Sequence, residues 1–368
     1  MRVALLGEQL FAPVPGGTGR YSRELWQALV RTAEPGNDLQ LWTAWHARAE
    51  LTRAGAPGAR RLPLPRRALT AAWEYGLPPA PQGAQLVHAP TPLAPRVQVP
   101  LVVTIHDTVP WTHPETLSRR GARWHIQMAE RAIGHGAHIT VPTQAVADSL
   151  SAMGLDLRPD HVHVLGAGVS AALAVPPSPA ESAEVARELD LPPRFVLSLA
   201  TFEPRKGLDI LLDALAELGP RAPILVLVGQ PGWGGLDPEA EARRRKVPAD
   251  RVRVLRSLPD RQLAVVLRRA EMLVMPSRAE GFGLPVLEAM AVGTPVICSD
   301  DPALCEVAGG AALVVARGDS GALAGALSEL GSDPVRRRGL SRLGLDRAAH
   351  FSWDEVGQRA WRLYAALV

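Results

Sequence analysis

The chain has 368 residues and a formal net charge of only +3, with 47% hydrophobic and 21% charged residues. This length predicts two domains, and the near-neutral charge gives no reason to expect nucleic acid as a partner. The two cysteines are too few for a disulfide framework or a four-cysteine zinc site. No apolar run is long enough to span a membrane, and no signal peptide is apparent, so we expect a cytoplasmic protein, either free or peripheral at the inner face of the membrane.

Short apolar strand patterns alternate with helical patterns along the whole chain, which is typical of parallel sheets. In the first half, helices are expected at 19–30 and 117–136. Strands are expected there at residues 2–7, 39–44, 85–89, 101–106, 138–142 and 161–165.

Residues 166–183 lose this periodicity and are rich in proline and small residues, so they are interpreted as a linker. The alternation then restarts, and residues 351–368 read as a final amphipathic helix. Strands in the second half are expected at 194–200, 223–229, 251–255, 272–276, 295–299 and 311–315. The prediction is an α/β protein with two doubly wound parallel sheets.

Ligands of such sheets bind beyond the carboxyl ends of the strands, so those loops are the candidate sites. The first loop contains Gly16, Gly17 and Gly19, which allow close backbone approach, and a helix start offers N–H groups to an anion. The loop is not G-x-G-x-x-G, and no acidic residue follows the second strand to hold a ribose. A plain flexible loop is an equally good interpretation.

The second loop begins with His106 and Asp107 at a strand end. Such a pair can position a proton acceptor or bind hydroxyl groups. Consecutive strand residues point to opposite faces, so a catalytic dyad is not expected. The alternative is a histidine that is satisfied by local hydrogen bonds.

The third loop carries Arg205 and Lys206 between a strand and a helix. An arginine offers a bidentate donor and a lysine a point charge, which together suit a diphosphate. Helix starts disfavour cations, so a ligand explains the pair better than a solvated basic helix start does.

The fourth loop, "PSRAEGFGLPVLEAMAVGTPVI", places Glu280 before a helix that Pro285 opens and Glu288 about one turn inside it. Carboxylates accept hydrogen bonds from vicinal hydroxyls, so a sugar or a ribose is the expected partner. The helix start offers an anion the backbone N–H groups of Phe282, Gly283 and Leu284.

These stretches resemble the family-four retaining glycosyltransferases of the GT-B fold. The resemblance rests on the E-x7-E string at Glu280 and Glu288, on "FEPRKG", on "GGTGRYSREL" and on "FSWDEV". It covers essentially the whole chain. It implies two Rossmann-like domains, residues 1–172 on the acceptor side and 173–351 on the donor side, with helix 352–368 packing back on the first domain.

The resemblance also implies a role for each site residue. Arg205 and Lys206 would hold the diphosphate of a nucleotide sugar, while Glu280 would bind the sugar hydroxyls and Glu288 the ribose. His106 would lie near the donor sugar and the acceptor hydroxyl. Backbone groups near Gly229 and Leu258 would hold the base, and Gly17 would approach the diphosphate.

The "HD" and "GRY" stretches look most like the mannosyl- and rhamnosyl-transferring branch that builds bacterial surface polysaccharides, so GDP-mannose is the favoured donor and a UDP- or dTDP-sugar the alternative. No cofactor or metal is expected, because Asp300 and Asp301 are the nearest approach to an Asp-x-Asp motif and a solvated turn explains them equally well. Two rival interpretations are a GT-B nucleotide-sugar epimerase and an inactive nucleotide-sugar-binding protein.

The acceptor is expected to be a glycan or a lipid-linked glycan. Arg66 and Arg67 lie in an arginine-rich stretch, 59–76, that also contains Trp73 and Tyr75, and such a stretch suits a lipid-linked acceptor or a peripheral membrane contact. Asp107 is a further candidate for acceptor binding. The alternative for 59–76 is an exposed, arginine-rich loop and helix start.

Overall fold

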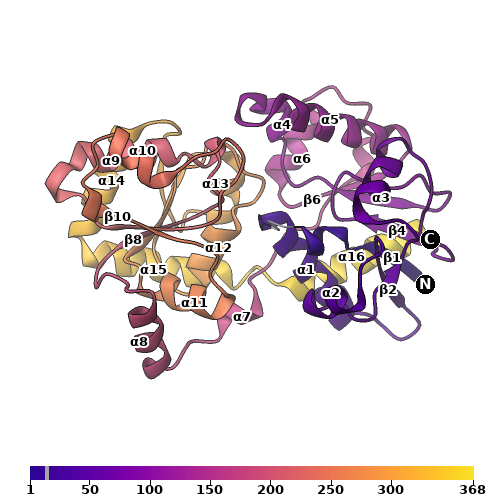
Figure 1. Cartoon of the computed structure of the whole chain (residues 1–368), viewed down its shortest axis with the longest axis horizontal. Helices are drawn as coiled ribbons and strands as arrows, with labels where there is room; N and C mark the ends of the chain where they lie inside the picture. Colours follow the sequence, from indigo (N-terminus) through magenta and orange to yellow (C-terminus); the bar gives the residue numbers. More distant parts are fainter. Residues whose placement is uncertain (13–15) are drawn as a thin grey trace. The chain divides into compact units, whose positions relative to one another are not determined.

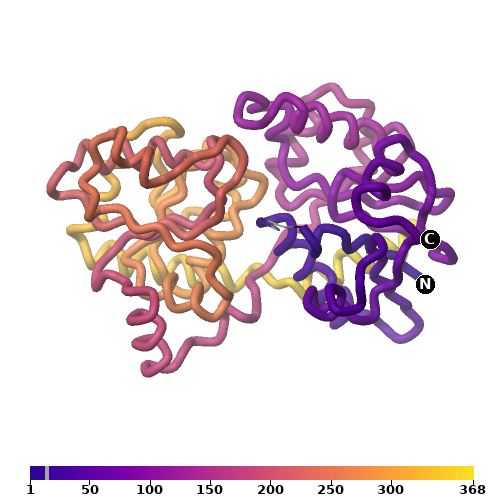
Figure 2. The backbone as a smooth tube through the Cα atoms, in the orientation of Figure 1, coloured from indigo at the N-terminus to yellow at the C-terminus, as the bar shows by residue number. Residues whose placement is uncertain are grey.

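The computed structural model describes residues 1–12 and 16–368. They form two compact units (Figure 1). Unit 1 contains Met1–Thr112, Arg119–Gly168 and Ser352–Val368, and unit 2 contains His113–Ser118 and Val169–Phe351. Figure 2 follows the chain out of unit 1, through unit 2 and back to unit 1 for its last helix. No helix in the described ranges is long and apolar enough to span a membrane.

Unit 1 is built on seven parallel strands in the order β3-β2-β1-β4-β5-β6-β7. Val3 in the central strand β1 pairs with Leu39 on one side and with Leu86 on the other. The apolar residues of β1 are buried, as expected for a parallel strand with both faces covered. The strands are β1 (Arg2–Leu6), β2 (Asp38–Thr43), β3 (Arg60–Arg61), β4 (Leu86–Ala89), β5 (Leu101–Thr104), β6 (His138–Val141) and β7 (Val162–Val164).

Six of these strands are the ones that the sequence predicts, and the edge strand β3 is the addition. Both of its residues are exposed arginines, so no alternation of apolar residues marks it. The helices of unit 1 are α1 (Gly16–Arg31), α2 (Arg48–Arg53), α3 (Arg66–Glu74), α4 (Val109–Thr112), α5 (Arg119–Gly134), α6 (Gln144–Ser151) and α16 (Trp353–Leu367), with 3₁₀ turns η1 (Glu8–Phe11) and η3 (Pro159–His161).

The last helix, α16, packs against α1, which confirms the expected return of the chain to the first domain (Figure 1). The two helices approach closely at Gly357, where an added Cβ would lie 2.5 Å from Oγ1 of Thr32. Trp361 Nε1 donates to the Leu29 carbonyl at 3.0 Å, and Arg31 forms an ion pair with Asp354.

A buried polar network lies where α16 meets the sheet. His88 Nδ1 lies 2.6 Å from the Tyr364 hydroxyl, and His88 Nε2 lies 3.0 Å from the Thr104 hydroxyl. Thr104 in turn lies 2.9 Å from the Thr140 hydroxyl, so the network crosses three neighbouring strands. None of these four side chains reaches solvent. Burial lowers the pKa of His88 to about 3, with repulsion from His106 adding to the effect.

Unit 2 has six parallel strands in the order β10-β9-β8-β11-β12-β13, all at predicted positions. The strands are β8 (Val196–Leu199), β9 (Leu225–Val228), β10 (Val252–Leu255), β11 (Met272–Met275), β12 (Val296–Ser299) and β13 (Leu313–Val315). The helices are α7 (Ala171–Ala174), α8 (Pro179–Glu188), α9 (Leu208–Leu218), α10 (Pro238–Arg244), α11 (Asp260–Arg269), α12 (Leu284–Ala291), α13 (Pro302–Ala308), α14 (Ser320–Ser332) and α15 (Pro334–Ala348), with 3₁₀ turns η2 (Pro114–Thr116), η4 (Pro204–Lys206), η5 (Gly219–Arg221) and η6 (Ala249–Arg251). The two parallel sheets confirm the predicted fold class.

The chain passes from unit 1 to unit 2 at Gly168–Val169, inside the predicted linker 166–183, but that stretch is not structureless, because it contains α7 and the start of α8. The Ser178 hydroxyl accepts a hydrogen bond from Glu181 N, and Pro179 occupies the first turn of α8. Because Val185 is the only buried residue of α8, the helix leaves almost no apolar periodicity in the sequence.

Candidate active site

The first element of the candidate site is the loop after β8. It forms the turn η4 (Pro204–Lys206) and then enters α9 through Gly207, which has a φ of 67°. A Cβ at Gly207 would lie 2.1 Å from the Pro276 carbonyl oxygen, so only glycine allows the two loops to approach this closely. This contact brings Arg205 and Lys206 beside the loop that follows β11.

The second element is that loop after β11, which leads into α12. Gly283 has a φ of 89° and precedes the helix, and a Cβ there would lie 2.3 Å from Cδ2 of Leu304. Pro285 occupies the first turn of α12, as the sequence predicts. The chain therefore turns sharply after Glu280.

Three predicted site residues meet in this part of unit 2. Lys206 Nζ donates to Glu280 Oε1 at 2.6 Å, and Arg205 Nη1 donates to Glu280 Oε2 at 3.1 Å. The Ser277 hydroxyl donates to Glu280 Oε1 at 2.7 Å, and Arg205 Nε donates to Glu203 at 3.2 Å. The side chains of Glu280, Lys206 and Arg205 are only 6%, 13% and 18% exposed, which excludes the solvated helix start.

The charges of this cluster are strongly coupled. Burial by itself raises the pKa of the Glu280 carboxyl, but attraction to Lys206 and Arg205 outweighs it and lowers the pKa to about 2. Burial lowers the pKa of Lys206, and repulsion from Arg205 adds to this, while Glu280 opposes both effects. Glu280 is therefore an anion at neutral pH, in contact with two basic side chains.

Arg278 ties the two loops together, a role that the sequence analysis missed. Its backbone N–H donates to the Arg205 carbonyl at 2.7 Å, and its Nη1 donates to the Pro204 carbonyl at 2.8 Å. The guanidinium also forms a bidentate ion pair with Asp209, at 2.8 and 2.6 Å. Because two of these acceptors lie on the basic loop and the other two on Asp209, in the helix that follows it, Arg278 fixes the position of Arg205 and Lys206.

Asp301 supports the glutamate loop and was also missed. Its Oδ1 accepts from the N–H groups of Ala303 and Leu304 at the start of α13, and its Oδ2 accepts from the backbone N–H of Glu280 at 3.3 Å. The residue is 4% exposed, so the solvated-turn interpretation is wrong for Asp301. Burial raises the pKa of this carboxyl, and Glu280 raises it further.

Asp300, in contrast, is exposed and pairs with Arg317 at 3.0 Å. Across residues 1–12 and 16–368, no group of three or more histidine, cysteine, aspartate or glutamate side chains could hold a metal ion.

The remaining predicted donor-site residues also lie in unit 2. Gly229 follows β9, and a Cβ there would lie 1.9 Å from the Ala200 carbonyl oxygen. Leu258 is half-buried just before α11. Glu288 is 2% exposed within α12, and Leu284 opens that helix. The Phe282 ring is buried against Phe351 at a centroid distance of 5.9 Å, so any ligand contact it makes is through its backbone. Their binding roles stay predictions.

His106 lies in unit 1, in the loop after β5. Its Nε2 donates to the Pro90 carbonyl at 2.8 Å, and Tyr21 packs edge-on against its ring at 4.8 Å. Burial lowers its pKa, which the Pro90 bond and Asp107 oppose, so the ring is mainly neutral with its lone pair on Nδ1. No bond joins His106 to Asp107 in the described structure; Asp107 Oδ1 instead accepts from Val109 N at 3.1 Å, at the start of α4.

Gly17 is exposed in the first turn of α1, while residues 13–15 of the same predicted loop lie outside the described residues. Of the two arginines assigned to the acceptor, Arg66 is engaged within unit 1. Its Nη1 donates to the Phe11 carbonyl at 2.7 Å, and its Nε lies 3.4 Å from Glu8. Arg67 is exposed.

Comparison with known proteins identifies relatives of both halves of the chain. Residues 15–173 match the family described as Glycosyltransferase Family 4, and residues 179–344 match the family described as glycosyl transferases group 1. The structure of Anabaena HepE in complex with UDP-glucose superposes on this chain with a TM-score of 0.76. The two sequences are 20% identical, and the alignment covers all of both chains.

Curated relatives are more similar in sequence. The D-inositol 3-phosphate glycosyltransferases of Segniliparus rotundus and Jonesia denitrificans are 32% and 31% identical over 292 and 299 residues, covering 74% of this chain in both cases and 62% and 67% of those enzymes. The O-antigen chain mannosyltransferase B of Escherichia coli is 35% identical over 198 residues, which cover 52% of this chain and 51% of that enzyme. The chain thus aligns with less than two thirds of the Segniliparus enzyme and about half of the Escherichia coli one.

The chain has two parallel-sheet units, and the second carries a basic pair bound to a carboxylate. The protein therefore has the GT-B fold. The chain belongs to the glycosyl transferases group 1, and its first half belongs to Glycosyltransferase Family 4. The predicted glycosyltransferase family is thereby confirmed, while the retaining mechanism and the mannosyl- or rhamnosyl-transferring branch stay predictions.

Proposed function

We propose that this chain is a retaining glycosyltransferase that moves a hexosyl group from a nucleoside diphosphate sugar to a hydroxyl group of an acceptor. The observation that supports this most directly is the contact of Lys206 and Arg205 with Glu280 at the carboxyl ends of β8 and β11. Cleavage of the sugar–phosphate bond places negative charge on the leaving diphosphate, and preorganised cations stabilise that charge.

Lys206 and Glu280 keep unused hydrogen-bonding positions with which to bind such a donor. An ammonium carries three N–H donors, and the bond to Glu280 uses one of those on Lys206. A carboxylate has about four acceptor positions, of which Lys206, Ser277 and Arg205 occupy three in Glu280. In our proposal the diphosphate binds the two basic side chains, and one sugar hydroxyl donates to Oε2 of Glu280.

The leaving diphosphate also takes the proton of the acceptor hydroxyl, so the reaction needs neither a metal nor a second carboxylate across the bond. His106 presents a neutral ring near the sugar and the acceptor. Glu288 binds the ribose, and backbone groups at Gly229 and Leu258 bind the base. We favour mannose or rhamnose as the sugar and GDP-mannose as the donor, since one relative is named as a mannosyltransferase.

The acceptor in this proposal is a glycan or a lipid-linked glycan used for cell-surface polysaccharide. Arg67 is exposed, and Tyr75, which follows α3, is 77% exposed, so both are accessible to a membrane or to the phosphate of a lipid-linked acceptor. Arg67→Gln is then expected to weaken binding to anionic vesicles. Unchanged binding would contradict the membrane part of the proposal.

The main test measures binding and hydrolysis of GDP-mannose, UDP-glucose and dTDP-rhamnose. One donor is expected to bind best, and Lys206→Ala is expected to reduce its turnover by about 100-fold or more, the typical effect of removing one group that stabilises a charged transition state. Lys246→Ala is the matched control, because Lys246 is the only other lysine and is exposed.

Product analysis separates the proposal from its rivals. An epimerised sugar without transfer would indicate an epimerase, and tight donor binding without turnover would indicate a binding protein. A product whose anomeric configuration is inverted would contradict the retaining mechanism.

A further inference from the structure

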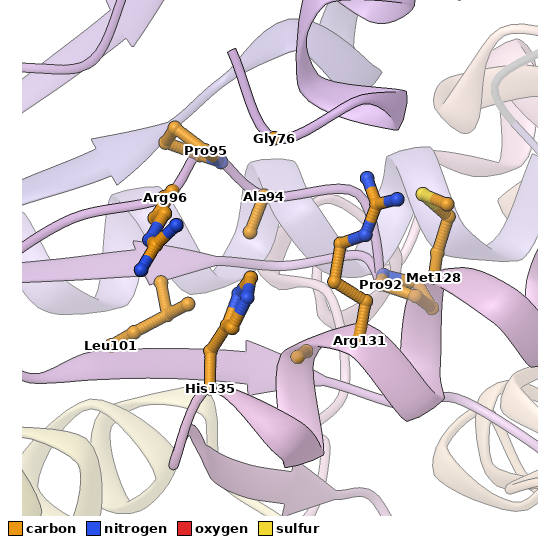
Figure 3. Close-up of a pocket in the computed structure, with 10 residues that line it drawn as sticks. Gly76, Pro92, Ala94, Pro95, Arg96, Leu101, Met128, Arg131 and His135 are labelled. Atoms are coloured by element: carbon orange, nitrogen blue, oxygen red, sulfur yellow. The ribbon is translucent and has the colours of Figure 1, made fainter. Parts of the chain in front are cut away.

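A pocket in unit 1 borders Gly76, just after α3, and none of the predicted donor-site residues lines it (Figure 3). Leu101, the first residue of β5, lines one side, Met128 and Arg131 on α5 line another, and the loop that carries Ala94 to Arg96 completes it. His106 follows the other end of β5. At about 3.3 Å per strand residue, roughly 17 Å of chain separates Leu101 from His106.

The ionisable residues that line this pocket are all basic: Arg96, Arg131 and His135. Figure 3 shows the three side chains arranged around the space, with the His135 ring between the two arginines. Arg131 Nη1 donates to the carbonyls of Trp73 and Glu74 at the end of α3. The side chains of Arg96 and His135 have no hydrogen bond or ion pair with any described residue.

The two arginines oppose a positive charge on the His135 ring. Burial lowers the pKa of His135, and the charges of Arg96 and Arg131 lower it further. His135 directly follows α5, where the helix C-terminus favours a positive charge and so resists this effect. An anion bound among the three side chains would remove the repulsion and favour the protonated ring.

We propose that this pocket binds the phosphate group of a phosphate ester. A phosphate monoester carries a charge near −2 and three acceptor oxygens, which match three basic side chains. The pocket has a volume of only about 10 Å³, about enough for one water-sized group, so a single phosphate oxygen enters it while the rest of the phosphate and of the ligand stays at its mouth. Leu101 and Met128 give the remaining wall an apolar character. None of the predicted donor-site residues lines this pocket, so the proposal adds a binding site to those of the proposed function.

The test follows the ring signals of His135 by NMR during titration with glycerol 3-phosphate, with His135→Gln used to assign them. We expect saturable shifts and a rise in the pKa of His135 on binding. Arg96→Gln is expected to weaken the affinity by about three- to tenfold, as for a partly exposed charge-assisted contact. Arg131 is left intact because it caps α3. Arg123→Gln, which removes an exposed charge from the same helix, should leave the affinity unchanged.

A second arm distinguishes the two sources of a phosphate ester. Vesicles that contain phosphatidic acid are compared with soluble glycerol 3-phosphate, using the wild-type protein and Arg96→Gln. Binding of either probe that depends on Arg96 supports the site and identifies the source. The proposal is overturned if neither probe moves the His135 signals, or if Arg123→Gln weakens binding as much as Arg96→Gln. Donor turnover should be the same in all these variants, so a failure here is distinct from a failure of the proposed function.

Discussion

The Lys206 ammonium and the Glu280 carboxylate form an ion pair with an Nζ–Oε1 distance of 2.6 Å, and both side chains are almost inaccessible to solvent. Two oppositely charged groups that are removed from water together are costly to separate, because each would be left buried and unpaired. The pair therefore holds the basic loop and the glutamate loop in one arrangement before any donor arrives.

The first prediction concerns the coupling of these two residues. We expect Lys206→Met and Glu280→Gln each to destabilise the protein, and the double variant to be more stable than the sum of the single losses implies. The coupling energy should be about 1–3 kcal/mol, as for residues in one buried network. Urea unfolding of the four proteins in a double-mutant cycle measures it. Additive losses would show that the pair is not coupled.

The second prediction concerns pH. The folded-state pKa of Glu280 is about 2, below its ordinary value of 4.5, so the unfolded chain binds the proton first as pH falls. The stabilisation from this carboxylate is thus complete above about pH 4.5 and is lost as the pH approaches 2, with an upper bound of about 3 kcal/mol. The stability difference between the wild type and Glu280→Gln should shrink over that range. A constant difference between pH 6 and pH 3 would contradict the assigned ionisation.

The third prediction concerns His88 in unit 1. Its folded-state pKa is about 3 against an ordinary 6.5, so the unfolded chain takes up the proton first as the pH falls below 6.5. The stabilisation of the folded protein by the neutral His88 ring is therefore complete above pH 6.5 and declines as the pH falls toward 3. Tyr364→Phe removes the partner of His88 Nδ1 and should cost about 1–3 kcal/mol, with faster amide exchange in α16. His350→Gln, at an exposed histidine, is the control and should change neither measurement.

The fourth prediction concerns Asp301. Asp301→Asn keeps the size of the side chain but replaces one carboxylate oxygen with an NH2 group. That NH2 group would face either the N–H of Glu280 or the N–H groups that open α13, and it cannot accept a hydrogen bond from them. Donor turnover should fall by roughly tenfold, the cost of one unmade buried hydrogen bond. Asp300→Asn, at the exposed neighbour, should have little effect. Equal losses in the two variants would exclude a specific positioning role.

The sequence predicts the two site loops, because their residue types and spacing are unusual. Glycines and a proline around Glu280 leave only a loop that opens a helix, and adjacent basic residues at Arg205 and Lys206 are rare at such a position, so the loops were predictable. The roles of Arg278 and Asp301 were not, because the bonds that tie each of them to the site reach residues far away in the sequence: Pro204 and Asp209 for Arg278, and the Glu280 N–H for Asp301. The strand β3 was missed for a different reason: it has only two residues, both exposed arginines, and it joins the sheet through its backbone.

The contact between α1 and α16 has a consequence for how the protein is made. All of unit 2 except His113–Ser118 is translated between Gly168 and Ser352, so unit 1 lacks its closing helix while the ribosome synthesises residues 169–351. The surface of α1 that receives Gly357 and Trp361 stays uncovered for that period. A protease cut within unit 2 would likewise leave α16 on the downstream fragment, so the two fragments should copurify.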